Sequence, residues 1–247
     1  MVEFGWSSLT RVQQIGVKYY DDLKQAIPRP EVEYIANTIL GHALDVDPGF
    51  EMTIVGGYRR GKPASGDVDV VLTHREESFT HFLVGRLVVA LENSGFVSHT
   101  LALSTRNSER GQEPLVWKGV SGQGTGFDTL DKAMLVWQMP EGRYPGSEGA
   151  ARPRRRVDII VSPWKTAGCA VIGWTGGTTF QRDLRRYCKV EKKLKFDSSG
   201  IRSRVDGSWV DFEEGALGKS PDVETSEKRV FAGLGLEWRP PEERCTG

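Results

Sequence analysis

Hydrophobic residues recur every three to four positions in the first part of the chain, a spacing that predicts amphipathic helices over residues 7–26 and 31–44. Pro28 and Pro30 separate the two segments, because proline in a helix interior removes a hydrogen bond and clashes with the preceding turn. The same kind of pattern predicts four further helices, at residues 79–94, 164–173, 180–190 and 225–234.

Short apolar runs predict strands over residues 52–55, 68–73, 133–138 and 156–161. Residues 98–131 are polar and rich in glycine, so we expect a long loop there, and such loops in compact domains are usually functional or disordered. A second loop, rich in proline and glycine, is expected over residues 139–151. This order of elements predicts two units, an α/β core to about residue 165 and a smaller α+β unit after it.

The segment Gly56–Val71 carries the most specific local signal. Asp67 and Asp69 stand two positions apart where a strand begins, so their side chains project from the same face. Before them, a glycine-rich turn carries Arg60 and Lys62, and its glycines let backbone N–H groups approach an anion closely. Because two parallel carboxylates can hold divalent cations, the segment predicts a site for a nucleoside triphosphate and Mg²⁺.

Asp158 stands alone among apolar neighbours in the strand predicted over residues 156–161. A buried charge is costly unless it is paired or bound to a metal. Asp158 is therefore either a third metal ligand or one half of a buried ion pair with Arg156 or another neighbour. Asp67 and Asp69 have their own alternative, which is solvation at the end of a strand.

Lysine plus arginine and aspartate plus glutamate number 33 each, so the 247-residue chain has no formal net charge. Overall charge therefore gives no indication of nucleic-acid binding, and local clusters matter more. Basic residues gather at 59–62, 152–156 and 182–195, which predicts a locally basic face. For residues 152–156 a solvated loop before a strand is an equal alternative.

Three cysteines stand singly, and no Cys/His pair has zinc-ligand spacing, so neither a disulfide framework nor a zinc site is predicted. His74, His81 and His99 have no partner motif and are expected to be structural or exposed. The start of the chain shows no secretory signal, and no apolar run is long enough to cross a bilayer, so no membrane partner is expected.

The glycine-rich turn with its aspartates, the single strand aspartate and the sequence Gly173-Trp174-Thr175-Gly176 resemble family X DNA polymerases in content and order. Residues 1–29 resemble part of the fingers subdomain, 30–165 the palm and 166–247 the thumb. The resemblance implies an α+β fold: a nucleotidyltransferase palm with a mixed sheet flanked by helices, a small α+β thumb and a residual helical fingers segment. The lyase-type domain, first helix-hairpin-helix and BRCT domain of the family have no counterpart here, so a catalytic fragment is expected.

Several positions are similar to the mu and terminal-transferase branch of this family. Gly57 and Gly173 stand where the beta and lambda branches carry serine and tyrosine, and residues 180–187 follow the mu and transferase pattern. In that branch a long loop can stand in for a missing template, so residues 104–127 are expected to govern template dependence. Gly66 is lambda-like, because the mu and transferase branch has a histidine there that is linked to template-free addition.

The resemblance also implies a role for each candidate residue. Asp67 and Asp69 would hold two Mg²⁺ ions, for which Mn²⁺ can substitute, and Asp158 would hold the catalytic ion beside the primer 3′-oxygen. The nucleotide-binding residues would be Gly56, Gly57, Arg60, Lys62, Gly66, Gly173, Trp174 and Gly176. The residues that contact DNA or the nascent base pair would be Gln181, Arg182 and Arg185. For Trp174, a place in the core is the alternative.

The implied function is a nuclear DNA nucleotidyltransferase that adds nucleotides from dNTPs to a primer 3′-hydroxyl, in double-strand-break end joining or gap-filling repair, with partial template independence. Its expected partners are primer ends in gapped or broken duplex, dNTPs, and end-joining factors that bind domains outside this chain. Three alternatives stay open: a strictly template-dependent lambda-like repair polymerase, a poly(A) polymerase-like or small-molecule nucleotidyltransferase, and a catalytically weak DNA-end-binding module. Primer extension with and without template separates them.

Overall fold

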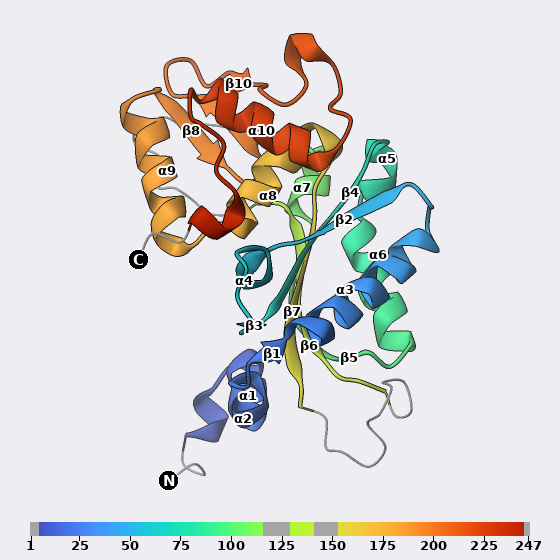
Figure 1. Cartoon of the computed structure of the whole chain (residues 1–247). Helices are drawn as coiled ribbons and strands as arrows, with labels where there is room; N and C mark the ends of the chain where they lie inside the picture. Colours follow the sequence, from blue (N-terminus) through green and yellow to red (C-terminus); the bar gives the residue numbers. More distant parts are fainter. Residues whose placement is uncertain (1–4, 116–128, 141–152, 245–247) are drawn as a thin grey trace.

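The computed structural model describes residues 5–115, 129–140 and 153–244 (Figure 1). Its centre is a mixed five-stranded sheet in the order β2-β4-β7-β6-β5. β4 and β7 run parallel, and the other neighbouring pairs are antiparallel. The strands are β2 (Phe50–Ile54), β4 (Val68–His74), β7 (Arg155–Val161), β6 (Asp131–Trp137) and β5 (Val97–Ser104).

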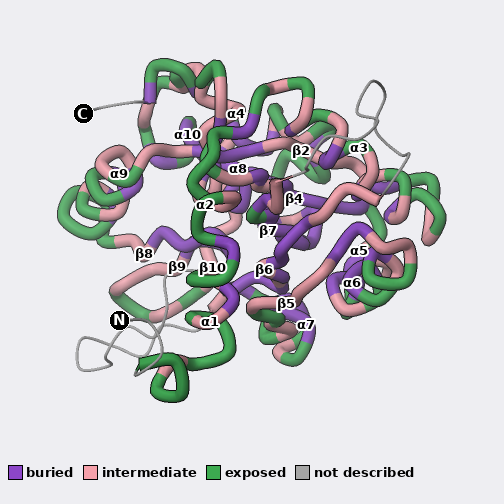
Figure 2. The backbone as a smooth tube through the Cα atoms, turned by 90° about the horizontal axis from the view of Figure 1, so that it is seen from below, coloured by how far each residue is buried: buried purple, intermediate pink, exposed green. Residues whose placement is uncertain are grey.

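One face of this sheet is covered by α3 (Arg29–Leu44) and α6 (Leu83–Asn93), which lie beside it in Figure 1. Alternate strand residues such as Val70 and Ile159 are fully buried against these helices, and the central strands are among the buried segments in Figure 2. Because strand side chains alternate, the helical face takes the apolar residues at even positions of β4 and odd positions of β7. The aspartates have the opposite parity and fall on the other face.

The other face of the sheet meets α8 (Ala167–Thr175) at one end. Val71 of β4 and Ile160 of β7 pack there with Ala170 and Val171 of the helix. This small second core joins the sheet to the C-terminal part of the chain. It also leaves the strand ends that carry the aspartates beside α8 rather than beneath a covering helix.

The C-terminal part has its own core, formed by residues such as Ile172, Leu184 and Phe231. Two of its helices, α8 and α10, approach closely, because a Cβ at Gly168 would lie only 2.6 Å from the backbone carbon of Ser226. Its elements are α8, α9 (Thr178–Val190), the antiparallel strands β8 (Leu194–Asp197), β9 (Gly200–Ser203) and β10 (Trp209–Val210), α10 (Val223–Gly233), and the short turns η2 (Trp164–Thr166), η3 (Gly215–Leu217) and η4 (Pro241–Arg244).

The N-terminal helix predicted over residues 7–26 is wrong as one element. The chain forms instead η1 (Trp6–Ser8), α1 (Arg11–Lys18) and α2 (Tyr20–Leu23). A capping box between Thr10 and Gln13 starts α1, and the break falls at Tyr19, which packs against the sheet through Val136. Beyond α2, β1 (Ile27–Pro28) pairs with β3 (Ala64–Ser65).

The helix predicted over residues 79–94 is also interrupted. α5 (Glu77–Thr80) and α6 are separated at Phe82, which has a left-handed backbone with φ of 54°. A hydrogen bond of 2.8 Å from the Phe82 N–H to Ser108 Oγ holds that conformation. Ser108 lies 26 residues later in the chain, so the sequence around Phe82 does not indicate the break.

The long loop predicted over residues 98–131 is shorter than expected. β5 extends to Ser104, and α7 (Arg106–Glu109) follows it. Asp131, which is buried, accepts hydrogen bonds from the backbone N–H groups of Asn107 and Ser108 at 2.8 and 3.1 Å and holds the start of α7. Residues 116–128 and 141–152, which include the rest of this loop and most of the second one, lie outside the described residues.

Among the residues that the structure describes, no helix has the length and apolar character needed to span a lipid bilayer.

We predict that Gly168→Ala destabilises the protein, because the added methyl group meets backbone atoms of α10 that cannot move without separating the two helices. The cost is expected to be about 1–3 kcal/mol in the free energy of unfolding. Gly85→Ala in α6 is the matched control, since nothing lies within 4 Å of a Cβ there. Urea unfolding of both variants tests the prediction, which fails if the two changes cost the same.

Candidate active site

Parallel pairing of β4 and β7 brings three carboxylates together. Asp69 and Asp158 are direct partners in the register of the two strands, and Asp67 lies two residues before Asp69 on the same face. One carboxylate oxygen of each residue lies within 4.8 Å of the other two. The sequence therefore correctly placed Asp67 and Asp69 on one face, and the structure adds Asp158 to them.

The electrostatics of this cluster are unfavourable without a cation. Burial, and then the neighbouring Asp158, raise the pKa of Asp69 to about 7, although Arg60 acts in the opposite direction. Burial likewise raises the pKa of Asp158, against the pull of Arg156 and Lys132. The Oδ1 atom of Asp158 is buried and has no hydrogen-bond partner.

Arg156 is the nearest positive charge to these carboxylates. It forms an ion pair with Asp67, and its Nε atom lies 3.8 Å from Asp158 Oδ1. The ion-pair alternative for Asp158 is thus present in the structure, but one arginine does not balance three carboxylates. A cluster of carboxylate oxygens with one orphaned buried atom suits hard divalent cations such as Mg²⁺ or Mn²⁺.

The glycine-rich turn is a helical turn rather than the loop that we expected. α4 (Gly56–Arg59) follows β2 directly, and Gly56 has φ of +60°. A Cβ at Gly56 would lie 2.1 Å from Asp69 Oδ2. Only glycine allows both this backbone conformation and the close approach of the Asp69 carboxylate.

Gly57, Arg60, Lys62 and Ser65 lie close to one another and next to Gly56, which touches the Asp69 carboxylate. A Cβ at Gly57 would lie 3.3 Å from Lys62 Cδ, 3.5 Å from Ser65 Oγ and 3.9 Å from Arg60 Nη2. Ser65 is buried, and its hydroxyl has no partner. A backbone without a side chain, two cations and a free hydroxyl form a group of donors that suits phosphate oxygens.

Ser65 is a candidate binding residue that our sequence reasoning missed. Its signal was present, because it stands within the Gly56–Val71 segment, but serine is common in turns and its burial depends on the pairing of β3 with β1. Gly66, by contrast, is exposed, and a Cβ there would meet nothing within 4 Å. Packing therefore does not exclude a larger residue at position 66.

The turn between α8 and α9 borders a pocket of about 400 Å³. Its lining residues are Gly173, Gly176, Thr178, Gln181, Arg182 and Arg185. Five of the residues predicted to bind nucleotide or DNA therefore share one cavity. Gln181 is buried, donates to the backbone oxygen of Ile172 at 2.5 Å and leaves its own Oε1 atom without a partner.

Trp174 is placed differently from the expectation. It does not line the pocket but packs against the second core beside Val171, with its ring centroid 5.7 Å from Lys132 Nζ. Trp174 therefore packs in the core, which is the alternative role that we gave for it. Gly173 also has a packing role, because a Cβ there would lie 2.8 Å from Ser198 Cβ.

The two groups of candidate residues meet through Arg60. Its Nη1 atom donates to the backbone oxygen of Thr175 at 2.7 Å, between Trp174 and Gly176. This hydrogen bond joins the basic turn at α4 to the turn that borders the pocket. The carboxylates can hold a divalent cation, and the basic turn can bind phosphate oxygens.

Comparison with known proteins agrees with this geometry. Residues 26–164 match the family model for the DNA polymerase beta palm, and residues 170–245 match that for the DNA polymerase beta thumb. The chain belongs to the family X DNA polymerases. The family predicted from the sequence and its α+β palm-and-thumb fold are therefore confirmed, whereas the exact boundaries at residues 29 and 165 stay predictions.

Three relatives illustrate the similarity. Human DNA-directed DNA/RNA polymerase mu is 30% identical over 250 residues, and Arabidopsis thaliana DNA polymerase lambda is 31% identical over 237 residues; each alignment covers 96% of this chain. Human DNA nucleotidylexotransferase is 28% identical over 242 residues and 95% of this chain. The chain spans only 45%, 40% and 44% of these three proteins, respectively, so it corresponds to less than half of each.

The basic cluster at residues 152–156 is only partly available to a ligand. Arg155 is buried and binds Glu31 of α3 through two hydrogen bonds of 2.7 and 2.8 Å, and Arg154 stacks on Tyr19. These arginines join β7 to the N-terminal helices. The alternative that residues 152–156 form a solvated loop is therefore wrong for Arg154 and Arg155. Among the described arginines of this cluster, Arg156 is the one that pairs with the carboxylates.

None of the described histidines and cysteines belongs to the carboxylate cluster or lines the pocket at α9. His74 is buried between Phe50 and Phe79. Cys169 and Cys188 are buried free thiols whose pKa values are raised by burial, so neither is a thiolate near neutral pH.

We predict that Asp69→Asn stabilises the metal-free protein, because it removes a charge whose pKa the fold raises to about 7. In EDTA at about pH 8, where wild-type Asp69 is ionised, the melting temperature should rise by about 2–4 °C per kcal/mol of relieved repulsion. Mg²⁺ or Mn²⁺ should then raise the melting temperature of wild type more than that of the variant.

Asp45→Asn is the control, since Asp45 is exposed at the end of α3. Equal shifts for Asp69→Asn and Asp45→Asn, or equal stabilisation of wild type and Asp69→Asn by the cation, would contradict the assignment of Asp69 as a metal ligand.

Proposed function

We propose that this chain is a DNA nucleotidyltransferase that transfers nucleotides from dNTPs to a primer 3′-hydroxyl in end joining or gap-filling repair. The observation that carries the proposal is the cluster of Asp67, Asp69 and Asp158, together with Arg60 of the neighbouring basic turn, which is hydrogen-bonded to the turn that borders the pocket at α9. Membership of a family whose relatives are named polymerases and nucleotidylexotransferases supports it.

The carboxylates would hold divalent cations, Asp67 and Asp69 two Mg²⁺ ions and Asp158 the one nearer the primer. When bound, such ions lower the pKa of the 3′-hydroxyl and neutralise charge on the attacking and leaving oxygens. Asp158, whose Oδ1 atom has no hydrogen-bond partner, would accept the proton of the 3′-hydroxyl.

The remaining side chains bind and orient the nucleotide. Arg60 and Lys62 would neutralise the β- and γ-phosphates, and the backbone at Gly57 lies close to both side chains. Ser65 would add its free hydroxyl to the same group of donors. Because these groups are fixed by α4 and the paired strands, they orient the triphosphate before the reaction begins.

The pocket at α9 is suited to the nascent base pair. Gln181 offers an unpartnered buried acceptor, and Arg182 and Arg185 border the same cavity with positive charge. Such groups can read base edges and contact the phosphate backbone of the template strand. The proposed partners are therefore gapped or broken duplex DNA and dNTPs, with end-joining factors bound outside this chain, and the proposed location is the nucleus.

A lambda-like, strictly template-dependent polymerase is the second candidate, and Gly66 favours it. The mu and transferase branch carries a histidine at this position, and here the position is open and without a side chain. Partial template independence would depend on the 104–127 segment, of which residues 116–127 lie outside the described residues.

We expect Asp67→Ala, Asp69→Ala and Asp158→Ala each to abolish primer extension while the protein still folds, because each removes a proposed cation ligand. Extension of a gapped primer–template with dNTPs and Mg²⁺ is the measurement, with circular dichroism to confirm folding. Asp45→Ala serves as the control and should extend normally. Normal extension by folded Asp158→Ala would remove Asp158 from the reaction.

Template dependence is tested by changing the loop without disturbing its base. Deletion of residues 107–124 would remove Asn107, Ser108 and Gln112, which are buried, so the deletion is better confined to residues 117–127. We expect this shorter deletion to leave gap filling intact and to reduce addition to single-stranded primers, and Gly66→His to increase that addition. If neither change alters template-free addition, the lambda-like alternative is favoured.

A further inference from the structure

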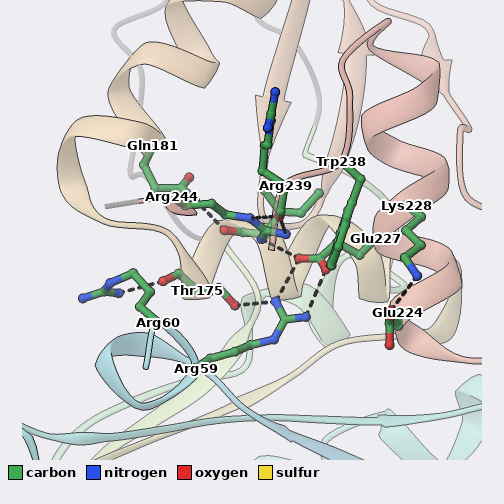
Figure 3. A network of polar contacts seen from close by, with 11 residues as sticks. Arg59, Arg60, Thr175, Gln181, Glu224, Glu227, Lys228, Trp238, Arg239 and Arg244 are labelled. Atoms are coloured by element: carbon green, nitrogen blue, oxygen red, sulfur yellow. Dashed lines mark hydrogen bonds and ion pairs between the residues drawn. The ribbon is translucent and has the colours of Figure 1, made fainter. Parts of the chain in front are cut away.

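A buried carboxylate outside the metal site joins three separate parts of the chain (Figure 3). Glu227 of α10 is fully buried and accepts hydrogen bonds from Arg59 at 2.8 and 3.0 Å. It also accepts one from Arg244 Nη1 at 2.7 Å and one from Trp238 Nε1 at 3.1 Å. Neither the Glu227 nor the Arg244 side chain is exposed, so water does not compete for their hydrogen bond.

This network reaches both halves of the proposed nucleotide site. Arg59 Nη1 also donates to Thr175 Oγ1 at 3.0 Å, and the next residue, Arg60, donates to the backbone oxygen of Thr175 at 2.7 Å. Thr175 is fully buried and lies between Trp174 and Gly176. Glu227 is thus linked through Arg59 to the residue that carries the phosphate-binding charge and to the turn that borders the pocket.

The C-terminal segment closes the network from the opposite side. Arg244 Nε and Nη2 donate to the backbone oxygen of Arg239 at 2.8 and 2.6 Å. These two hydrogen bonds hold residues 239–244 in a turn around the Arg244 guanidinium. A Cβ at Gly61 would lie 3.1 Å from Glu242 Cγ, and one at Gly177 would lie 3.6 Å from the Arg244 carbonyl oxygen. The segment therefore packs against both the basic turn and the turn between α8 and α9.

The charges in this network hold one another in a single arrangement. Burial alone would raise the pKa of Glu227, but the hydrogen bonds from Arg59 and Arg244 outweigh it and lower the pKa to about 2. Loss of Glu227 leaves the buried Arg244 guanidinium without its carboxylate, and loss of Arg244 removes one of the two arginines that hold Glu227. Such a fully bonded unit is rigid, and rigidity is what a residue needs in order to fix the position of its neighbours.

We propose that Glu227 and Arg244 are positioning residues of the nucleotide site, which act through Arg59 and Thr175 to fix Arg60 beside the carboxylates. This inference rests on the proposed function, because it assigns the network to nucleotide binding. Neither Glu227 nor Arg244 can touch the nucleotide, since both side chains are fully buried. Their effect is therefore on the affinity for the triphosphate and not on the chemical step.

The test compares steady-state extension by wild type, Glu227→Gln and Arg244→Met on a gapped primer–template. We expect the KM for dATP to rise about tenfold while kcat changes less than about threefold, because Arg60 would no longer be held where it binds the phosphates of dATP. Glu31→Gln is the matched control, because it weakens the ion pair with the buried Arg155, and neither residue belongs to the network or lines the pocket. It should lower the melting temperature and leave KM unchanged.

A double-mutant comparison separates positioning from general loosening. If the network acts through Arg60, Glu227→Gln should raise KM by less than about twofold in an Arg60→Ala background. An equal rise in both backgrounds, or a KM that stays unchanged while stability falls, overturns the inference. If Glu227→Gln does not fold, Arg244→Lys, which keeps the charge but cannot form the same forked hydrogen bonds, carries the same comparison.

Calorimetry of dATP binding with Mg²⁺, carried out on the same proteins, distinguishes failure of the proposed function from failure of the positioning role. Wild type that binds dATP but does not extend a primer would overturn the proposed function, while the affinities of the variants would still test the network. Wild type that neither binds nor extends would overturn both.

Discussion

Repulsion among three carboxylates is the interaction that the rest of this structure is arranged to withstand. Asp67, Asp69 and Asp158 are held close by strands whose other face is the main hydrophobic core. The burial that fixes them also removes the water that would screen their charges, which is why the pKa of Asp69 rises to about 7. Apolar packing of β4 and β7 against α3 and α6 supplies the free energy that keeps the cluster together.

The arginines around the cluster differ in the groups that they contact. Arg156 contacts the carboxylates directly, whereas Arg60 is held on the Thr175 carbonyl, and Arg59 is committed to Glu227. Two consecutive arginines therefore have opposite tasks, since one faces the site and the other anchors the turn. A basic cluster in a sequence does not by itself distinguish a ligand-binding side chain from a structural one.

The parts of the fold that sequence reasoning predicted are those determined by local pattern. Alternation along β4 placed Asp67 and Asp69 on one face, and helical spacing predicted α3, α9 and α10 nearly in full. What it missed depends on partners distant in the chain. The break at Phe82 depends on Ser108, and the burial of Arg155 depends on Glu31, so neither leaves a mark in its own segment.

The parallel pairing of β4 and β7 has a consequence for how the chain folds. Between these strands the chain must complete α5, α6, β5 and β6, and β6 lies beside β7 in the sheet. Contacts between residues so far apart form late, because the entropy of closing the long loop must first be overcome. A partly folded palm would contain Asp69 without Asp158 beside it. Binding of a divalent cation with high affinity would therefore indicate that β4 and β7 have paired.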